Sequence, residues 1–173
     1  MKRSVSLIPL AVVLALTVFL DGCASETRIS YNSSPEYTLI RIEESKSGRS
    51  IFELYGNGTI RVRRNPFEDE VEGGQIAQRQ VRQILEHVIN KLKIGDLQSS
   101  YPEEFIPGIE MYPNMDLVLE VTVEGFEKSI SFAYSNICNE LKYFLEEGRI
   151  DRQAFEELSR LKAIVEYLLE YKF

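Results

Sequence analysis

Apolar and polar residues alternate over three short segments after residue 36, a pattern typical of strands with one buried face. The first segment contains Leu39, Ile40 and Ile42, and a polar turn over 44–49 follows it. The second and third segments, 51–55 and 59–64, flank three residues that include two glycines, which predicts a β-hairpin. We therefore expect the domain to begin with three antiparallel strands.

The Gly56-Asn57-Gly58 sequence between the last two segments decides how those strands pair. A two-residue Asn57-Gly58 turn would mix apolar and charged side chains on one face of the hairpin. A three-residue loop with Gly58 in the left-handed conformation separates them. We therefore predict the register that pairs Leu54 with Ile60, Phe52 with Val62, and Glu53 with Arg61.

A second amphipathic pattern predicts another hairpin over 116–134. Alternate residues from Leu117 to Val123 are apolar, and a glycine at 125 leads into the next alternating segment. A type II′ turn with Gly125 as its first central residue pairs Val121 with Ile130 and Leu119 with Phe132. The same register places Glu124 opposite Glu127, a like-charge pair that is mildly destabilising.

Three stretches show the spacing of amphipathic helices. The first ends before Gly95 and has an apolar stripe made of Ala77, Val81, Ile84, Leu85, Val88 and Leu92. The second ends at Gly148 and has the stripe Ile137, Leu141, Phe144 and Leu145. The third, which Asp151 can cap, has the stripe Ala154, Leu158, Leu161, Val165 and Leu168.

These patterns predict a single α+β domain over 37–173, with the element order βββ-α-ββ-αα. The expected architecture is an antiparallel sheet of about five strands with helices packed on one face.

Residues 94–114 follow neither periodicity and contain three prolines. Long irregular loops are uncommon in compact domains and often carry function. We predict a partner surface from the five large apolar residues that no pattern assigns to the core: Tyr101, Phe105, Ile109, Met111 and Tyr112. The alternative is that these side chains are buried against the core.

The N-terminus has the layout of a secretory signal. Lys2 and Arg3 precede an almost uncharged apolar run over 5–20. The run is shorter than the roughly 20 apolar residues that a membrane-spanning helix needs, and Pro9 interrupts it. We expect residues 1–22 to be removed on export, so that the mature domain lies outside the cytoplasm.

Leu20-Asp21-Gly22-Cys23 follows the apolar run: an aliphatic residue, a variable one, a small one and a cysteine. This site resembles the lipobox of bacterial lipoproteins, although that family usually has a small or hydroxyl residue where Asp21 stands. The resemblance, which covers only the signal and this site, implies a diacylglyceryl group on the Cys23 sulfur and cleavage just before Cys23. An ordinary signal cut near Ala24 or Ser25 is the alternative.

Charge limits the partners of the mature chain. Removing Lys2, Arg3 and Asp21 from the 20 basic and 27 acidic residues leaves 18 and 26, a formal charge of −8. Such a domain repels nucleic acid and anionic headgroups on average, so we expect membrane attachment through lipid on Cys23. The polar residues 23–36 are expected to be the lipidated N-terminus and a flexible tether. In Gram-negative members of the family, Ala24 after the cysteine is compatible with outer-membrane sorting.

The remaining chemistry-bearing residues suggest no catalytic set. Cys138 shares a helical face with Leu141, which predicts a buried, unreactive thiol, and His87 is expected to be exposed on a polar flank. The acidic run 68–72 lacks the spacing of a calcium loop and is interpreted as a solvated connector. We expect no metal or cofactor, and a non-catalytic binding or assembly module of the cell envelope. The alternative is an envelope hydrolase or thiol-dependent enzyme.

Overall fold

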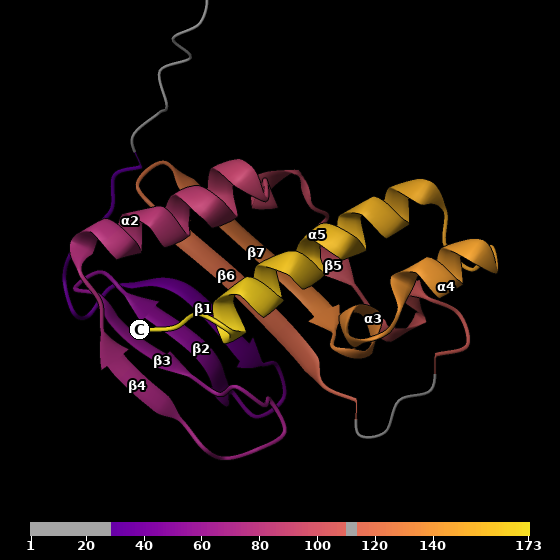
Figure 1. The fold of residues 1–173 in the computed structure, drawn as a ribbon, viewed down its shortest axis with the longest axis horizontal. Coiled ribbons are helices and arrows are strands. Elements are labelled where there is room, and N and C mark those ends of the chain that lie inside the picture. Colours follow the sequence, from indigo (N-terminus) through magenta and orange to yellow (C-terminus); the bar gives the residue numbers. More distant parts are fainter. Residues whose placement is uncertain (1–28, 110–113) are drawn as a thin grey trace, which may run out of the picture.

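The computed structural model describes residues 29–109 and 114–173, which form a sheet and a layer of helices (Figure 1). The predicted signal, Cys23, Met111 and Tyr112 lie outside these residues. The first half of the described chain contains β1 (Thr38–Glu44), β2 (Ser50–Tyr55), β3 (Thr59–Val62), β4 (Glu72–Gln75), α2 (Gln78–Glu86), a π-helical turn (His87–Lys91) and a 3₁₀ turn (Ile94–Asp96). The second half contains β5 (Ser100–Tyr101), a 3₁₀ turn (Glu103–Phe105), β6 (Asp116–Val123), β7 (Phe126–Ala133), α3 (Ser135–Cys138), α4 (Leu141–Glu146) and α5 (Arg152–Leu169).

The sheet has seven strands in the order β4-β3-β2-β1-β6-β7-β5. All neighbouring strands are antiparallel except β5, which pairs with β7 in parallel. The α+β class is confirmed, whereas the expected five strands are too few because β4 and β5 lie at the two edges. These edge strands pair through their backbones and carry no apolar alternation of side chains that a sequence pattern could reveal.

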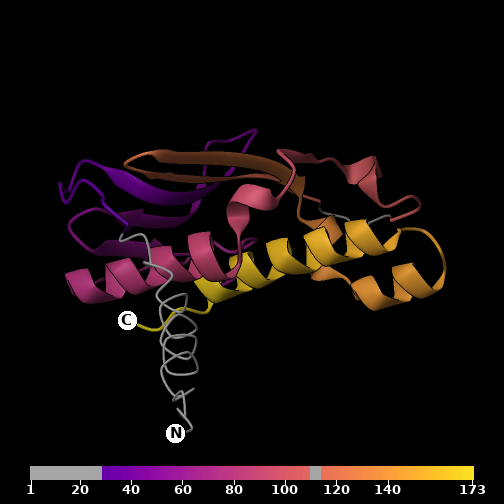
Figure 2. The same ribbon diagram turned by 90° about the horizontal axis from the view of Figure 1, so that it is seen from above.

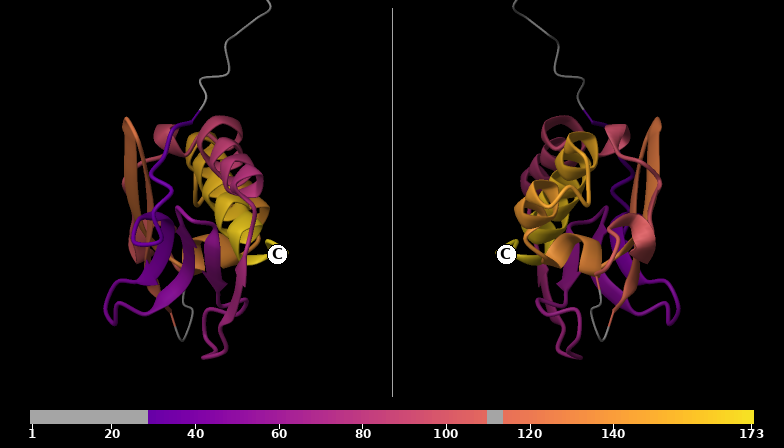
Figure 3. Two further views of the ribbon diagram at one scale, coloured as in Figure 1. Left: turned by 90° about the vertical axis from the view of Figure 1, so that its left-hand side faces the viewer. Right: turned by 90° about the vertical axis from the view of Figure 1, so that its right-hand side faces the viewer.

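The helices α2 and α5 lie side by side on one face of the sheet, as two perpendicular views show (Figure 2; Figure 3). The inward side chains of the strands and helices meet between these layers and form the core. The fully buried core residues include Ile40, Ile42, Phe52, Leu54, Ile60, Leu119, Ile130, Val81, Ile84, Leu85, Leu158 and Leu161.

The first hairpin has the predicted register. Leu54 faces Ile60, Phe52 faces Val62, and Glu53 faces Arg61. Gly58 closes the loop with φ +89°, in the left-handed region that L side chains adopt rarely. The turn residue and the apolar pattern therefore specify the same pairing.

The predicted register of the second hairpin is wrong by two residues. Leu119 faces Ile130, and the turn is Glu124-Gly125, with Val123 facing Phe126. Gly125 has φ +75° and occupies the second central position, not the first. A shift of two residues leaves the same side chains on the inward face, so the apolar pattern could not distinguish the two registers. The observed register also removes the expected pairing of two glutamates.

The stripe predicted from residue 77 is confirmed at its centre, where Val81, Ile84, Leu85 and Val88 are fully buried. The helix is not uniform, because α2 continues as the π-helical turn, and its end is set by Lys93 at φ +51° rather than by Gly95. His87 begins the π-helical turn and is half-buried, with its ring 4.2 Å from that of Tyr167 between centroids. The expected full exposure of His87 is therefore wrong.

Residues 29–36, the described part of the predicted tether, lie against the domain. The Ser30 carbonyl accepts a hydrogen bond from the Glu124 N–H at 3.1 Å, and the Tyr31 hydroxyl donates to Gln78 Oε1 at 2.7 Å. A Cβ at Gly56 would overlap the Asn32 carbonyl oxygen, so the segment passes where only glycine leaves room. The prediction of a flexible tether therefore applies to residues 23–28 only.

The C-terminal helices follow the predicted stripes. The first stripe is divided between α3 and α4, and Gly148 at φ +69° follows α4. Asp151 caps α5 as predicted, since its side chain accepts a hydrogen bond from the Ala154 N–H at 2.8 Å.

Replacing Asp151 with alanine is expected to lower the free energy of unfolding by about 1 kcal/mol, because one helix N–H loses its acceptor. Urea unfolding measures the effect, and Asp151→Asn, which retains an accepting oxygen, is the matched control. Equal losses in both variants would mean that the carboxylate charge, not the capping hydrogen bond, matters.

Candidate partner-binding site

The structure separates the residues of the predicted partner surface. Tyr101 is 0% exposed and belongs to the core, so its assignment to a surface is wrong. Phe105 is half-buried with its ring 5.1 Å from that of Tyr101, and Ile109 packs partly buried against the core. Strand β5 draws Tyr101 inward, since its backbone pairs with β7 beside Phe132. The alternative of burial therefore holds for Tyr101.

Tyr101 is tied to a buried carboxylate. Its hydroxyl donates to Glu157 Oε2 at 2.8 Å and accepts from the Gln98 N–H at 2.9 Å. Glu157, which is 6% exposed, also accepts from Gln153 Nε2 at 3.0 Å. Burial raises the pKa of Tyr101, and the hydrogen bond to Glu157 adds to this rise. Burial alone would raise the pKa of Glu157 too, but the hydrogen bonds from Gln153, Tyr101 and Gln98 leave it below its ordinary value.

Among the described residues, two of the four exposed large apolar side chains lie in the loop over 63–71 that joins β3 to β4. Phe67 is 37% exposed and Val71 is 48% exposed. The β3–β4 loop lies at the lower edge of the molecule in these views, and the described chain begins at the upper edge (Figure 1; Figure 3). Large apolar groups on a surface loop are candidates for partner contacts.

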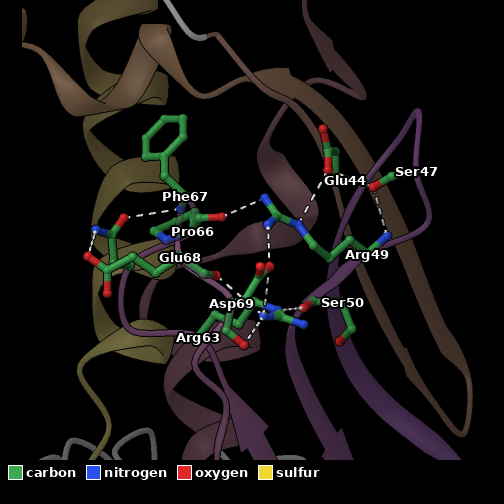
Figure 4. A network of polar contacts seen from close by, with 10 residues as sticks. Glu44, Ser47, Arg49, Ser50, Arg63, Pro66, Phe67, Glu68 and Asp69 are labelled. Carbon is green, nitrogen blue, oxygen red and sulfur yellow. Dashed lines mark hydrogen bonds and ion pairs between the residues drawn. The ribbon is translucent and has the colours of Figure 1, made fainter.

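Arg49, the residue directly before β2, holds this loop from one side (Figure 4). Its guanidinium donates to the Pro66 carbonyl at 2.8 Å and lies 3.4 Å from the Asp69 carboxylate. On its other side it pairs with Glu44 at 3.5 Å. One planar cation thus joins the β1–β2 turn to the backbone of the loop.

Arg63 holds the loop from its first residue. Its Nε donates to the Ser50 carbonyl at 2.8 Å, and its Nη1 donates to the carbonyls of Glu68 and Asp69 (Figure 4). Asn65 adds a local turn, because its Oδ1 accepts the Phe67 N–H at 3.1 Å. Backbone carbonyls of the loop are therefore bonded to side chains that the sheet positions.

The loop surrounds its apolar residues with negative charge. Glu68, Asp69 and Glu70 are exposed, and the side chain of Asp69 is 95% exposed although it pairs with Arg49. Phe67 rests edge-on against Tyr134, with ring centroids 5.7 Å apart. Burial raises the pKa of Tyr134, with Cys138 and Glu166 adding to the rise, so its hydroxyl stays neutral beside Phe67. The loop therefore presents an exposed aromatic ring next to exposed carboxylates.

Sequence reasoning missed this site because the acidic run was interpreted as a connector. Arg49 lies outside the loop, and Arg63, its first residue, is fixed by a hydrogen bond to Ser50 that also reaches outside it, so nothing in the local sequence identifies these contacts. The one usable signal was Pro66-Phe67, an aromatic residue within a charged, otherwise polar stretch.

Cys138 departs from its prediction, since the residue is exposed rather than buried. Its sulfur lies 3.6 Å from the Ser135 carbonyl oxygen. Partial burial nevertheless raises the pKa of the thiol, and the Lys162 ammonium offsets only part of the rise. A thiol with a raised pKa is mostly protonated at neutral pH and is a weak nucleophile.

Within residues 29–109 and 114–173 no group of three or more histidine, cysteine, aspartate or glutamate side chains is arranged to hold a metal ion. In the same residues, no helix is both long enough and apolar enough to traverse a bilayer.

The fold and this site define the chain as an α+β protein with an open seven-stranded sheet and an acidic β3–β4 loop that Arg49 and Arg63 hold in place. Comparison with known proteins identifies no relative: no protein-family model, no curated protein and no solved structure matches the chain.

Proposed function

We propose that this chain is a lipid-anchored protein of the bacterial cell envelope that binds a protein partner through the β3–β4 loop. Lipid on Cys23 would attach it to the membrane, with the domain facing the periplasm or the cell exterior. The lipobox-like site and the apolar run before it support the anchor. In a Gram-negative cell, Ala24 would be compatible with the outer membrane.

The observation that carries the binding role is that Arg49 and Arg63 hold the backbone of the loop on which Phe67 is exposed. An apolar side chain on a loose loop loses conformational entropy when it binds, whereas hydrogen bonds from Arg49 and Arg63 hold this loop before any partner arrives. Aromatic residues presented in this way are the usual anchors of protein interfaces. The loop is therefore suited to insert Phe67 into an apolar depression on a partner.

Charge defines the partner further. Glu68 and Glu70 are exposed and form no ion pair with other described residues. A complementary surface would carry lysine or arginine around its apolar depression. The expected partner is thus an envelope protein with a basic rim, and its association should weaken as salt concentration rises.

Photo-crosslinking in living cells tests this proposal. A photoreactive phenylalanine analogue at position 67 is expected to capture one partner in high yield, with crosslinked peptides rich in lysine or arginine. The matched control is the same analogue at Tyr143, an exposed aromatic residue on α4, which should give little product. Equal yields at both positions would show that the loop has no special role.

The substitution Phe67→Ser supplies an affinity measurement with the partner so identified. Affinity is expected to fall about tenfold or more, as for a typical aromatic anchor. Tyr143→Ser should leave it unchanged. A folded Phe67→Ser protein that binds as well as the wild type would place the partner surface elsewhere.

A further inference from the structure

A second polar site lies where the described chain begins. A cavity of about 440 Å³ is lined by Ile29, Ser30, Tyr31, Ser33, Gln78 and Arg82. Residues 29–33 form one wall, and the first two turns of α2 form the other. The hydrogen bond between Tyr31 and Gln78 joins the two walls.

The charge of this cavity is opposite to that of the protein. Among the described residues no carboxylate lines it, whereas each of three other cavities is lined by at least one glutamate: those beside Lys162, beside Arg61 and beside Arg64. Arg82 supplies a positive charge that cannot be removed by deprotonation. In a mature chain with a formal charge of −8, such a cavity stands out as a place for an anion.

Among the described residues, Arg82 has no carboxylate partner, unlike most of the other arginines. Every arginine of the described residues except Arg79 and Arg82 pairs with a carboxylate. The Nε of Arg82 is buried and, like the Nε of Arg41 and of Arg49, has no hydrogen-bond partner within the described part of the chain. Since no ion pair among the described residues neutralises it, the Arg82 guanidinium retains its charge and N–H groups for an oxyanion.

We propose that this cavity binds a phosphate group, with Arg82 as its cationic contact and the Ser30 and Ser33 hydroxyls as additional donors. A guanidinium presents two parallel N–H groups to phosphate oxygens, and hydroxyls complete such sites. Two sources share this chemistry, a phospholipid headgroup and a soluble phosphate. The phospholipid source depends on the proposed function, because lipid on Cys23 would keep this part of the domain near the membrane surface. Cys23 is six positions before Ile29.

The test uses the exported protein as cells produce it, in an uncharged maltoside detergent, with inorganic phosphate as the probe. Titration at constant ionic strength, against chloride, is expected to shift the Arg82 Nε–H resonance saturably in ¹⁵N spectra. Arg82→Gln should weaken binding about tenfold or more, measured at the backbone resonances of Tyr31 and Gln78. Arg79→Gln, on the same helix but outside the cavity, should change it less than about twofold.

The variant Arg82→Lys keeps the charge but lacks the paired N–H groups. Its phosphate affinity is expected to fall by a factor between those of Arg79→Gln and Arg82→Gln, and this measurement replaces the one on Arg82→Gln if that variant does not fold. No saturable shift at Arg82, or unchanged affinity in a folded Arg82→Gln protein, would overturn the proposal. Tighter binding of glycerophosphoglycerol than of inorganic phosphate assigns the cavity to a lipid headgroup, and the reverse order assigns it to soluble phosphate.

This outcome is separate from that of the anchor. Phosphate binding is measured whether or not Cys23 carries lipid. Loss of binding in a protein with lipid on Cys23 rejects the cavity alone, and retained binding in a protein without lipid rejects the anchor alone.

Discussion

Replacing Cys23 with serine is expected to abolish lipid incorporation and to move the protein from the membrane fraction to the soluble fraction. A hydroxyl cannot form the thioether through which the lipoprotein family carries its diacylglyceryl group. Each buried methylene contributes about 0.8 kcal/mol to membrane binding, so losing several acyl chains removes most of the affinity. The acidic mature chain supplies no general electrostatic attraction to replace them.

Metabolic labelling with a fatty acid, followed by fractionation, measures both effects. Cys138→Ser is the matched control, because it makes the same atomic change at the other cysteine of the chain. This control should keep full labelling and membrane attachment. A Cys23→Ser protein that still incorporates lipid would reject the anchor, and a wild type without any label would favour the ordinary signal cleaved near Ala24 or Ser25.

Tyr101→Phe is expected to lower the free energy of unfolding by about 2 kcal/mol, although it changes a single oxygen. The ring would still fill its place in the core, but Glu157 would lose a donor at 2.8 Å and the Gln98 N–H would lose its acceptor. A buried polar group left without a partner costs about 1–3 kcal/mol. Urea unfolding at pH 7 measures the loss, and Phe105→Leu, at a half-buried neighbour, is the control for altered packing.

The pH dependence of this variant identifies the cause. The pKa of Glu157 is lowered in the folded protein, so its stabilising effect is complete above its unfolded value of 4.5 and is lost as the pH falls through the folded value. Without the Tyr101 hydroxyl the folded pKa should rise. The stability difference between wild type and Tyr101→Phe is therefore expected to shrink as the pH falls below about 4.5. A difference that stays constant down to acid denaturation would assign the loss to packing.

The two hairpins show how far side-chain patterns determine a fold. In the first, a one-residue shift would reverse every side chain, so the apolar pattern and Gly58 together allowed one register. In the second, a shift of two residues keeps the same side chains inward, so the apolar pattern fits two registers and the predicted one is wrong. Alternation defines faces more reliably than partners, because its period is two.

The partner surface shows a different limit. The absence of periodicity in residues 94–114 was interpreted as exposure, yet Tyr101 is buried by a two-residue parallel strand. The prediction for Cys138 is wrong in the opposite direction: the residue is exposed, because α3, which was expected to bury it, ends at Cys138. Both errors arise where short elements replace the long ones that a pattern can predict.

The sequence by itself determined what is encoded locally: the lipobox-like site as a prediction, the α+β class, the first hairpin register, the buried stripes and the Asp151 cap. These depend on side chains close together along the chain, within a hairpin or a few helical turns. Tertiary structure alone decided the edge strands β4 and β5, the hydrogen bonds by which Arg49 and Arg63 hold the β3–β4 loop, and the cavity around Arg82. Each of these joins residues distant in sequence through backbone groups or single cations, and such contacts leave no periodic trace because only folding brings their partners within hydrogen-bonding distance.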